Sequence, residues 1–148
     1  MSSIPIAQYH QFAVAPSQTE SVEGVWPDGL DLEQTVVLPI VTGDGFLLVT
    51  GIADGPIDIQ VAPTDPPVGT WEQHGTTIIE VREPLVLRPV DSEHGTWSEV
   101  FAPAKPGRHR IDVFAKGRMA HWDLSIDPKK RRGLEQYMIV ISPLDSAS

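Results

Sequence analysis

The chain has 148 residues, no cysteine and a formal net charge of −9, so it is long enough to bury a core in one domain and it excludes disulfides and thiolate-bound metals. A surface this acidic is repelled by phosphate backbones and anionic lipid headgroups, which argues against direct nucleic-acid binding and against a membrane partner. No apolar run approaches the length of a membrane span, and residues 1–5 lack the features of a secretory signal. We therefore expect a cytoplasmic protein.

Short runs rich in β-branched residues, separated by Gly, Pro and Asp, predict β-strands and no helix. The expected strands cover residues 4–14, 22–26, 34–41, 46–53, 57–61, 76–82, 85–90, 97–102, 108–116, 119–125 and 136–142. Residues 46–49 are apolar on both faces, which predicts a central strand covered on both sides. The alternation in residues 57–61 predicts one buried and one solvated face. Pro39, Pro84 and Pro89 predict edge positions, bulges or strand breaks.

This pattern predicts an all-β fold, namely a single-domain, two-sheet antiparallel β-sandwich that covers residues 1–148. Residues 43–45 have the sequence Gly-Asp-Gly, which lacks the spacing of a phosphate-binding loop and predicts a hairpin turn. The proline-rich segment of residues 62–69 is too short for a domain linker, and we expect it to be an ordered loop.

The sequence contains no catalytic or metal-binding motif. Five histidines are candidate imidazole ligands, but none lies at the spacing of a metal site, so we interpret them as structural or surface residues. They are His10, His74, His94, His109 and His121. No serine lies in a nucleophile elbow. We therefore expect no cofactor, no bound metal and no enzymatic activity.

Four tryptophans are many for a chain of this size, and three of them lie beside turn residues. They are Trp26, Trp71, Trp97 and Trp122. Indole rings stack on sugars, and on a β-sandwich that use would make the protein a carbohydrate-binding module. Burial of the rings under loops and anchoring of a protein partner are the alternative interpretations.

The only dense basic patch in the sequence is residues 129–132, Lys-Lys-Arg-Arg. Patches of this kind serve nuclear import or nucleic-acid binding. Four charges without interleaved aromatic residues, on an acidic chain, instead favour a solvated turn between the last strands. Alternatively, the patch would pair with the acidic half of a second copy and give a homo-oligomer.

Basic residues are absent from the first half of the chain. No Lys or Arg precedes Arg82, whereas the same stretch contains 11 Asp and Glu residues; from Arg82 onward there are 11 basic and 9 acidic residues. This asymmetry indicates recognition of a basic partner rather than catalysis. The densest acids surround Trp26 in a turn-rich stretch, where a loop would present five carboxylates around one aromatic anchor. These acids are Glu20, Glu23, Asp28, Asp31 and Glu33.

The strand expected at residues 4–14 would tie the N-terminal segment into a sheet. Alternation along this strand puts Tyr9 and Gln11 on one face and Phe12 and Val14 on the other. We expect Phe12 and Val14 to pack in the core, and Tyr9 and Gln11 to face the partner.

The tetrapeptide Tyr9-His10-Gln11-Phe12 resembles the opening strand of the competence protein ComJ family, the bacterial inhibitors of a DNA-entry nuclease. Residues 78–81 and 101–111 resemble that family's later strands and the turn into its penultimate strand. The resemblance implies a small acidic protein that binds a DNA-degrading nuclease and blocks it, with no catalysis of its own.

The charge pattern leads to the same hypothesis. A nuclease presents a positive groove to phosphates, so the carboxylates of an inhibitor would mimic nucleic acid and compete for that groove. The sequence therefore predicts an inhibitor or immunity-type protein that blocks a basic nuclease or toxin. The alternatives are an acidic β-sandwich adaptor with an unknown partner, and the carbohydrate-binding module.

Overall fold

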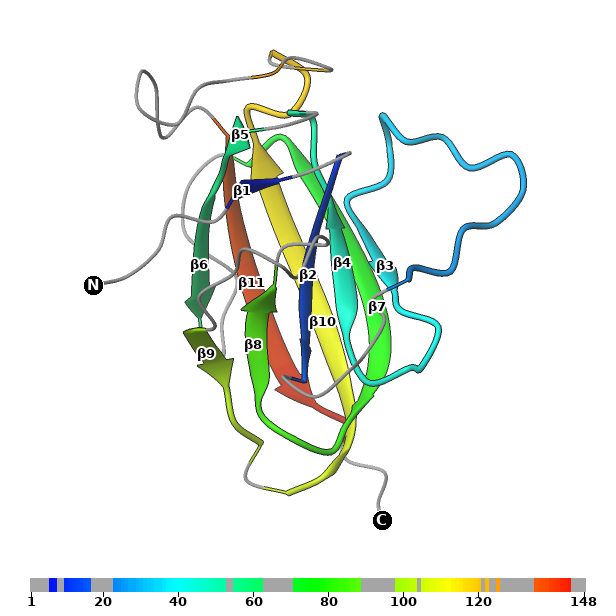
Figure 1. The fold of residues 1–148 in the computed structure, drawn as a ribbon, viewed down its shortest axis with the longest axis vertical. Coiled ribbons are helices and arrows are strands. Elements are labelled where there is room, and N and C mark those ends of the chain that lie inside the picture. Colours follow the sequence, from blue (N-terminus) through cyan, green and yellow to red (C-terminus); the bar gives the residue numbers. More distant parts are fainter. Residues whose placement is uncertain are drawn as a thin grey trace.

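The computed structural model describes residues 6–7, 10–16, 23–52, 55–62, 71–88, 98–103, 105–120, 122, 125 and 135–144. Every regular element in these residues is a β-strand. Two large sheets pack face to face around an apolar core (Figure 1). The predicted all-β sandwich is therefore confirmed.

One sheet has four strands in the order β6-β11-β10-β7. Their bounds are Asp58–Ala62 for β6, Gln136–Pro143 for β11, Gly107–Lys116 for β10 and Gln73–Val81 for β7. β10 pairs antiparallel with β7 and with β11, but β11 pairs parallel with β6. The expectation of a purely antiparallel sandwich is wrong at this pair. β6 and β11 lie far apart in the chain, so no hairpin fixes their relative direction.

The other sheet has five antiparallel strands in the order β3-β4-β2-β8-β9. Their bounds are Val37–Pro39 for β3, Phe46–Val49 for β4, Gln11–Pro16 for β2, Leu85–Arg88 for β8 and Ser98–Phe101 for β9. A short ladder joins β1 (Ile6–Ala7) to β5 (Gly55–Pro56). Pro39 ends an edge strand, as predicted, and residues 43–45 form the predicted turn between β3 and β4.

The core lies between the two large sheets. Phe12 and Val14 contribute from β2, and Ile111 and Ile139 contribute from β10 and β11; none of the four is more than 1% exposed. Burial of apolar side chains on this scale is the main force that holds the sheets together. The prediction that Phe12 and Val14 share a packed face is confirmed.

The strand β4 is buried on both faces, because all four of its residues have no exposed surface. Leu47 points away from the main core and packs with Ala13 and Ile40 in a second apolar cluster. A Cβ atom built on Gly24 would lie 2.5 Å from Leu47 Cδ1, so the backbone at Gly24 rests directly on this side chain. The predicted central strand is confirmed, and the chain around Gly24 provides its outer cover.

The strand expected at residues 4–14 is divided into β1 and β2. His10 lies between them with a φ of 62°, a left-handed conformation that interrupts an extended backbone. The alternation of the sequence continues through this position, so composition alone does not indicate the break. Tyr9 lies outside the described residues.

Two further expected strands are wrong. Of residues 22–26, the structure describes 23–26, and these make only one isolated bridge, between Gly24 and Ile40. Of residues 119–125, the structure describes 119, 120, 122 and 125. Met119 and Ala120 lie in a turn that begins at Arg118, and the backbone N–H of Trp122 lies 3.5 Å from the carbonyl oxygen of Met119. Both segments have strand-like composition, but their described residues form no strand. Three predicted features lie wholly or largely outside the described residues: the loop at residues 62–69, Pro89, and the basic patch at residues 129–132.

Candidate functional site

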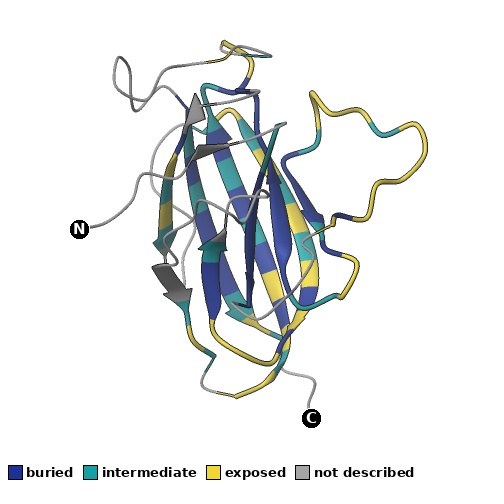
Figure 2. Ribbon diagram, in the orientation of Figure 1, coloured by how far each residue is buried: buried dark blue, intermediate teal, exposed yellow. Residues whose placement is uncertain are grey.

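The candidate site is an exposed segment that precedes β3, residues 23–35, which we call the acidic loop. It extends from the side of the sandwich beside β3 and β7 (Figure 1), and most of its length is exposed (Figure 2). Its exposed carboxylates belong to Glu23, Asp28, Asp31 and Glu33. Its exposed apolar side chains are Val25 at 45%, Trp26 at 41% and Leu32 at 36%. The loop therefore combines negative charge with apolar surface.

The first half of the acidic loop is fixed to the β3–β4 hairpin by its backbone. The N–H of Val25 donates to the carbonyl oxygen of Pro39 at 2.9 Å, and the N–H of Val41 donates to that of Glu23 at 2.8 Å. Together with the contact of Gly24 on Leu47, these bonds hold the entry of the loop against the sheet. The indole of Trp26 lies against this anchored stretch, because a Cβ atom built on Gly24 would lie 3.2 Å from its Nε1, and 41% of the residue is exposed.

The second half of the acidic loop is held by Arg118, which follows β10 and is only 1% exposed. Its guanidinium donates to Leu32 O (2.9 Å), Glu33 O (3.0 Å), Thr35 O (2.8 Å), Val49 O (2.9 Å) and Gln73 Oε1 (2.6 Å). Three of these acceptors are backbone carbonyls of the acidic loop. Hydrogen bonds that involve a charged donor are the stronger ones in proteins, so this side chain fixes the loop exit to the sandwich.

The buried position of Arg118 depends on close packing around it. A Cβ atom built on Gly51 would collide with the carbonyl oxygen of Arg118, so only glycine fits there. The ring of Trp122 lies 5.6 Å from the guanidinium carbon, within the range of a cation–π contact. Trp122 also packs on His10, whose Nδ1 is 2.8 Å from the carbonyl oxygen of Thr50. Aromatic and backbone groups thus enclose the cation.

Close to Arg118 lies a buried carboxylate, Glu135, with no exposed surface. Its oxygens accept from the backbone N–H groups of Gly51 (3.2 Å) and Ile52 (2.9 Å) and from the hydroxyl of Tyr137 (2.5 Å). Burial raises the pKa of Glu135, against the opposing effects of these hydrogen bonds and of the Arg118 charge. The pKa of the Tyr137 hydroxyl is also raised, by its own burial and by the neighbouring carboxylate. These groups connect the segment after β4 to the start of β11.

The carboxylates of the acidic loop are not neutralised within the described part of the chain. The ion pairs found there join His74 to Asp112, Arg110 to Asp112 and Arg82 to Glu80. Arg118 binds the backbone carbonyls of the loop and not its carboxylates. Within the loop, Asp31 Oδ1 accepts a hydrogen bond from the backbone N–H of Glu33 at 3.0 Å. Among the described residues, therefore, no Lys or Arg side chain forms an ion pair with a carboxylate of the loop.

The structure places the predicted site residues in different surroundings. Trp26 and four of the predicted carboxylates lie together on the acidic loop. Gln11 begins β2, pairs with Val49 and is partly buried, so it belongs to the sheet and not to the loop. Glu20 and Tyr9 lie outside the described residues.

Sequence reasoning missed the residues that hold the loop. Arg118 and Glu135 are charged, and charged side chains are normally exposed, so no local pattern indicated their burial. The apolar residue Leu32 could have been found in the sequence, because it lies between the acids Asp31 and Glu33.

The described residues show neither the pattern of a metal site nor that of a membrane-spanning helix. No group of three or more His, Asp or Glu side chains there is arranged to hold a metal ion, and no helix among them is long and apolar enough to cross a membrane. In comparisons with known proteins, no family model, no curated protein and no solved structure matches this chain. The function of the site is therefore inferred from its own geometry.

Proposed function

We propose that this protein binds and blocks a basic protein partner through the acidic loop, and that the partner is a DNA-degrading nuclease. The observation that carries the proposal is the exposure of carboxylates and of Trp26 on a loop that is anchored at both ends. Arg118 and the β3–β4 hairpin supply those anchors.

An anchored loop is suited to tight recognition because ordering it on binding costs little conformational entropy. Exposed carboxylates attract a basic surface over long range and raise the association rate by a factor of about 10 to 10³. Trp26, together with the exposed Val25 and Leu32 of the same loop, supplies apolar surface of the kind that gives binding hot spots their energy. Charge would bring the partner to the loop, and the indole would hold it there.

A nuclease is the basic partner that this chemistry fits best. Its substrate-binding surface must attract phosphates, so carboxylates on an anchored loop compete for the same cationic groups. The local resemblance of residues 9–12 to the ComJ family supports the same class of partner. The loop would act as a nucleic-acid mimic, and inhibition would require no chemical step.

The test compares two variants of equal charge. Glu23→Gln with Asp28→Asn removes two carboxylates from the acidic loop, and Asp58→Asn with Glu83→Gln removes two exposed carboxylates elsewhere. Each protein is used as bait in a lysate of the source organism at low salt, and retained proteins are assayed for cleavage of plasmid DNA. We expect the wild type and the control variant to retain and inhibit a nuclease, and the loop variant to retain much less.

Measured association rates then show whether the loop carboxylates attract the partner over long range. The wild-type rate should fall steeply between low salt and about 0.5 M salt, because exposed charges are screened at that ionic strength. An association rate that is insensitive both to salt and to the loop variant would contradict the proposal. A retained partner whose activity is unaffected by binding would mean that the protein is an adaptor and not an inhibitor.

A further inference from the structure

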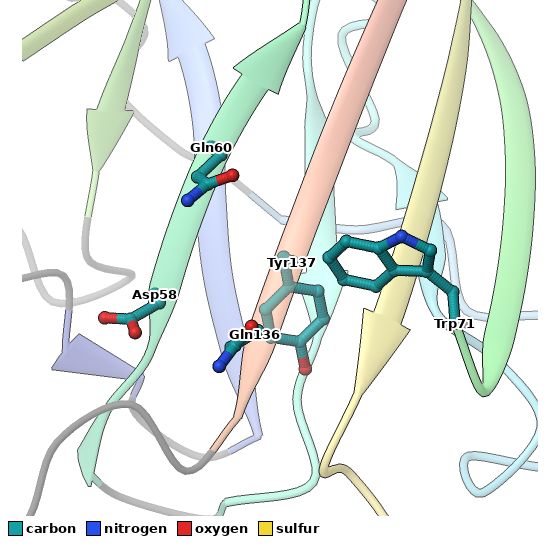
Figure 3. Close-up of a pocket in the computed structure, with 5 residues that line it drawn as sticks. All are labelled: Asp58, Gln60, Trp71, Gln136 and Tyr137. Carbon is teal, nitrogen blue, oxygen red and sulfur yellow. The ribbon is translucent and has the colours of Figure 1, made fainter. Parts of the chain in front are cut away.

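A pocket of about 120 Å³ lies on the outer face of the four-stranded sheet (Figure 3). It is lined by Asp58, Gln60, Trp71 and Gln136, and also by Tyr137, which is itself buried and donates from its hydroxyl to Glu135. The outward direction follows from strand alternation, because the neighbouring Ile59 and Val61 pack against the core while Asp58 and Gln60 are exposed. The pairing of Asp58 with Gln136 places these two residues side by side on adjacent strands.

One wall of the pocket is the indole of Trp71. The ring lies 6.5 Å from the ring of Phe114, and Lys116 Nζ lies 4.8 Å from its centre, so neighbours on β10 hold it in place. The residue is nevertheless only partly buried. Figure 3 shows the indole across β11 from Asp58 and Gln60, with Gln136 and Tyr137 between them. The pocket is therefore bounded by an aromatic surface on one side and by polar side chains on the other.

The polar lining of the pocket combines two kinds of hydrogen-bonding group. The carboxylate of Asp58 accepts hydrogen bonds, and the amide of Gln60 both donates and accepts them. Hydroxyl groups, which also donate and accept, are the natural complement of such a set. The indole of Trp71 offers an apolar surface for the C–H groups of a sugar ring. Charges of both signs, on Asp58 in the lining and on Lys116 beside the indole, favour a neutral ligand over an ionic one. The polar groups disfavour a purely apolar ligand.

From these features we propose that the pocket binds one neutral sugar residue. At about 120 Å³ the pocket is small, so it receives part of one ring and leaves the remainder of a longer glycan outside. The acidic loop lies beside β3 and β7, whereas the pocket lies over β6 and β11 at the opposite side of the four-stranded sheet. The two proposed sites are formed mainly by different elements, but Trp71 lies two residues before Gln73, which hydrogen-bonds Arg118 and Glu33. Substitutions of Gln60 and Asp58 therefore test the pocket without altering an anchor of the acidic loop.

The test is an NMR titration of the isotopically labelled protein with neutral oligosaccharides: fragments of β-glucan, xylan and chitin, each up to about 10 mM because single-residue sites bind weakly. We expect at least one of them to shift the indole N–H of Trp71 and the side-chain amides of Gln60 and Gln136. Trp71→Ala should weaken binding about tenfold or more. Trp26→Ala, on the acidic loop, should leave the affinity unchanged.

Two variants keep the test decisive if Trp71→Ala does not fold. Gln60→Ala and Asp58→Asn change exposed side chains, so both should remain folded and each should weaken binding severalfold. The proposal is overturned if no oligosaccharide shifts the Trp71 resonance, if the shifts cluster at Trp26, or if the Gln60 and Asp58 variants bind like the wild type. The two proposals fail separately. A wild-type protein that binds a sugar but inhibits no nuclease would contradict only the proposed inhibition, and one that inhibits a nuclease but binds no sugar would contradict only the sugar site.

Discussion

Glu135 is a carboxylate held without exposed surface between the backbone N–H groups of Gly51 and Ile52 and the hydroxyl of Tyr137. Three donors satisfy its oxygens, which is the condition under which a buried carboxyl group is tolerated. Burial nevertheless outweighs these bonds and raises its pKa above 4.5. The folded protein therefore holds a proton on Glu135 more tightly than the unfolded chain does.

The first prediction concerns the pH dependence that results. Because the pKa of Glu135 is higher in the folded state, its contribution to stability is greatest at low pH and falls as pH rises from 4.5 through the folded-state pKa. Glu135→Gln keeps the shape and does not titrate. Urea unfolding between about pH 4 and pH 8 should show the wild type losing stability relative to this variant as pH rises. A difference that stays constant, or grows in favour of the wild type, would contradict the assignment.

At the scale of elements, the acidic loop depends on one side chain from the other sheet. Arg118 follows β10, yet three of its acceptors are carbonyl oxygens of Leu32, Glu33 and Thr35. A guanidinium offers five donors in a fixed planar fork and keeps its charge when buried, whereas a lysine ammonium offers three from a single atom. Only arginine can satisfy the carbonyls of the loop, Val49 and Gln73 together.

The second prediction is that Arg118→Lys frees the acidic loop. The variant leaves buried carbonyl groups without donors, so the free energy of unfolding should fall by at least about 2 kcal/mol. Hydrogen exchange of backbone amides at residues 23–35 should become faster, while exchange in β10 stays slow. Arg110→Lys is the matched control, because Arg110 is exposed and pairs only with Asp112 in the described structure; it should change stability by less than about 0.5 kcal/mol. Unchanged exchange in the loop of the Arg118 variant would exclude this anchoring role.

The elements that the sequence predicted well are those whose own residues determine their surroundings. Residues 46–49 are apolar throughout and form a central strand, and residues 57–61 alternate and form a strand with one exposed face. Strand prediction from composition was wrong where contacts with residues far away in the sequence determine the backbone conformation. Residues 22–26 look like a strand, but Gly24 rests on Leu47 and pairs at a single bridge.

The candidate site also contains residues that the sequence predicts and residues that it does not. Charge is readable in a sequence, so the order of residues alone identifies the carboxylates around Trp26. The anchors could not be identified in this way, because Arg118 lies 83 to 86 positions from the loop carbonyls it binds and no local pattern connects them. Gln11 was predicted on the first strand, and the structure places it at the start of β2, paired with Val49 and outside the acidic loop; its contact with a partner stays a prediction.

At the scale of the whole molecule, the net charge of −9 is concentrated in the half of the sequence that precedes Arg82. Like charges on one loop repel one another and oppose the compact state. The third prediction is that added NaCl raises the melting temperature of the isolated protein by screening this repulsion. The increase should be smaller in the variant with Glu23→Gln and Asp28→Asn, which should start from a higher melting temperature at low salt.

Differential scanning calorimetry from about 0.02 M to about 0.5 M NaCl measures both effects. The variant with Asp58→Asn and Glu83→Gln serves again as the control for an equal change in net charge. A melting temperature that falls with salt to the same extent in all three proteins would show that the loop carboxylates do not repel one another in the folded state.

The position of β11 in the four-stranded sheet has a consequence for biosynthesis. β11 lies between β6 and β10, although it follows both in the chain. While the polypeptide is being made, β6 and β10 therefore emerge before the strand that separates them exists, and the core lacks Ile139 and Ile141. Unpaired strand edges and exposed apolar faces are the features that promote aggregation of nascent chains. The sandwich can be completed only after β11 has been translated, so until then the growing chain exposes strand edges and apolar surface that the finished protein covers.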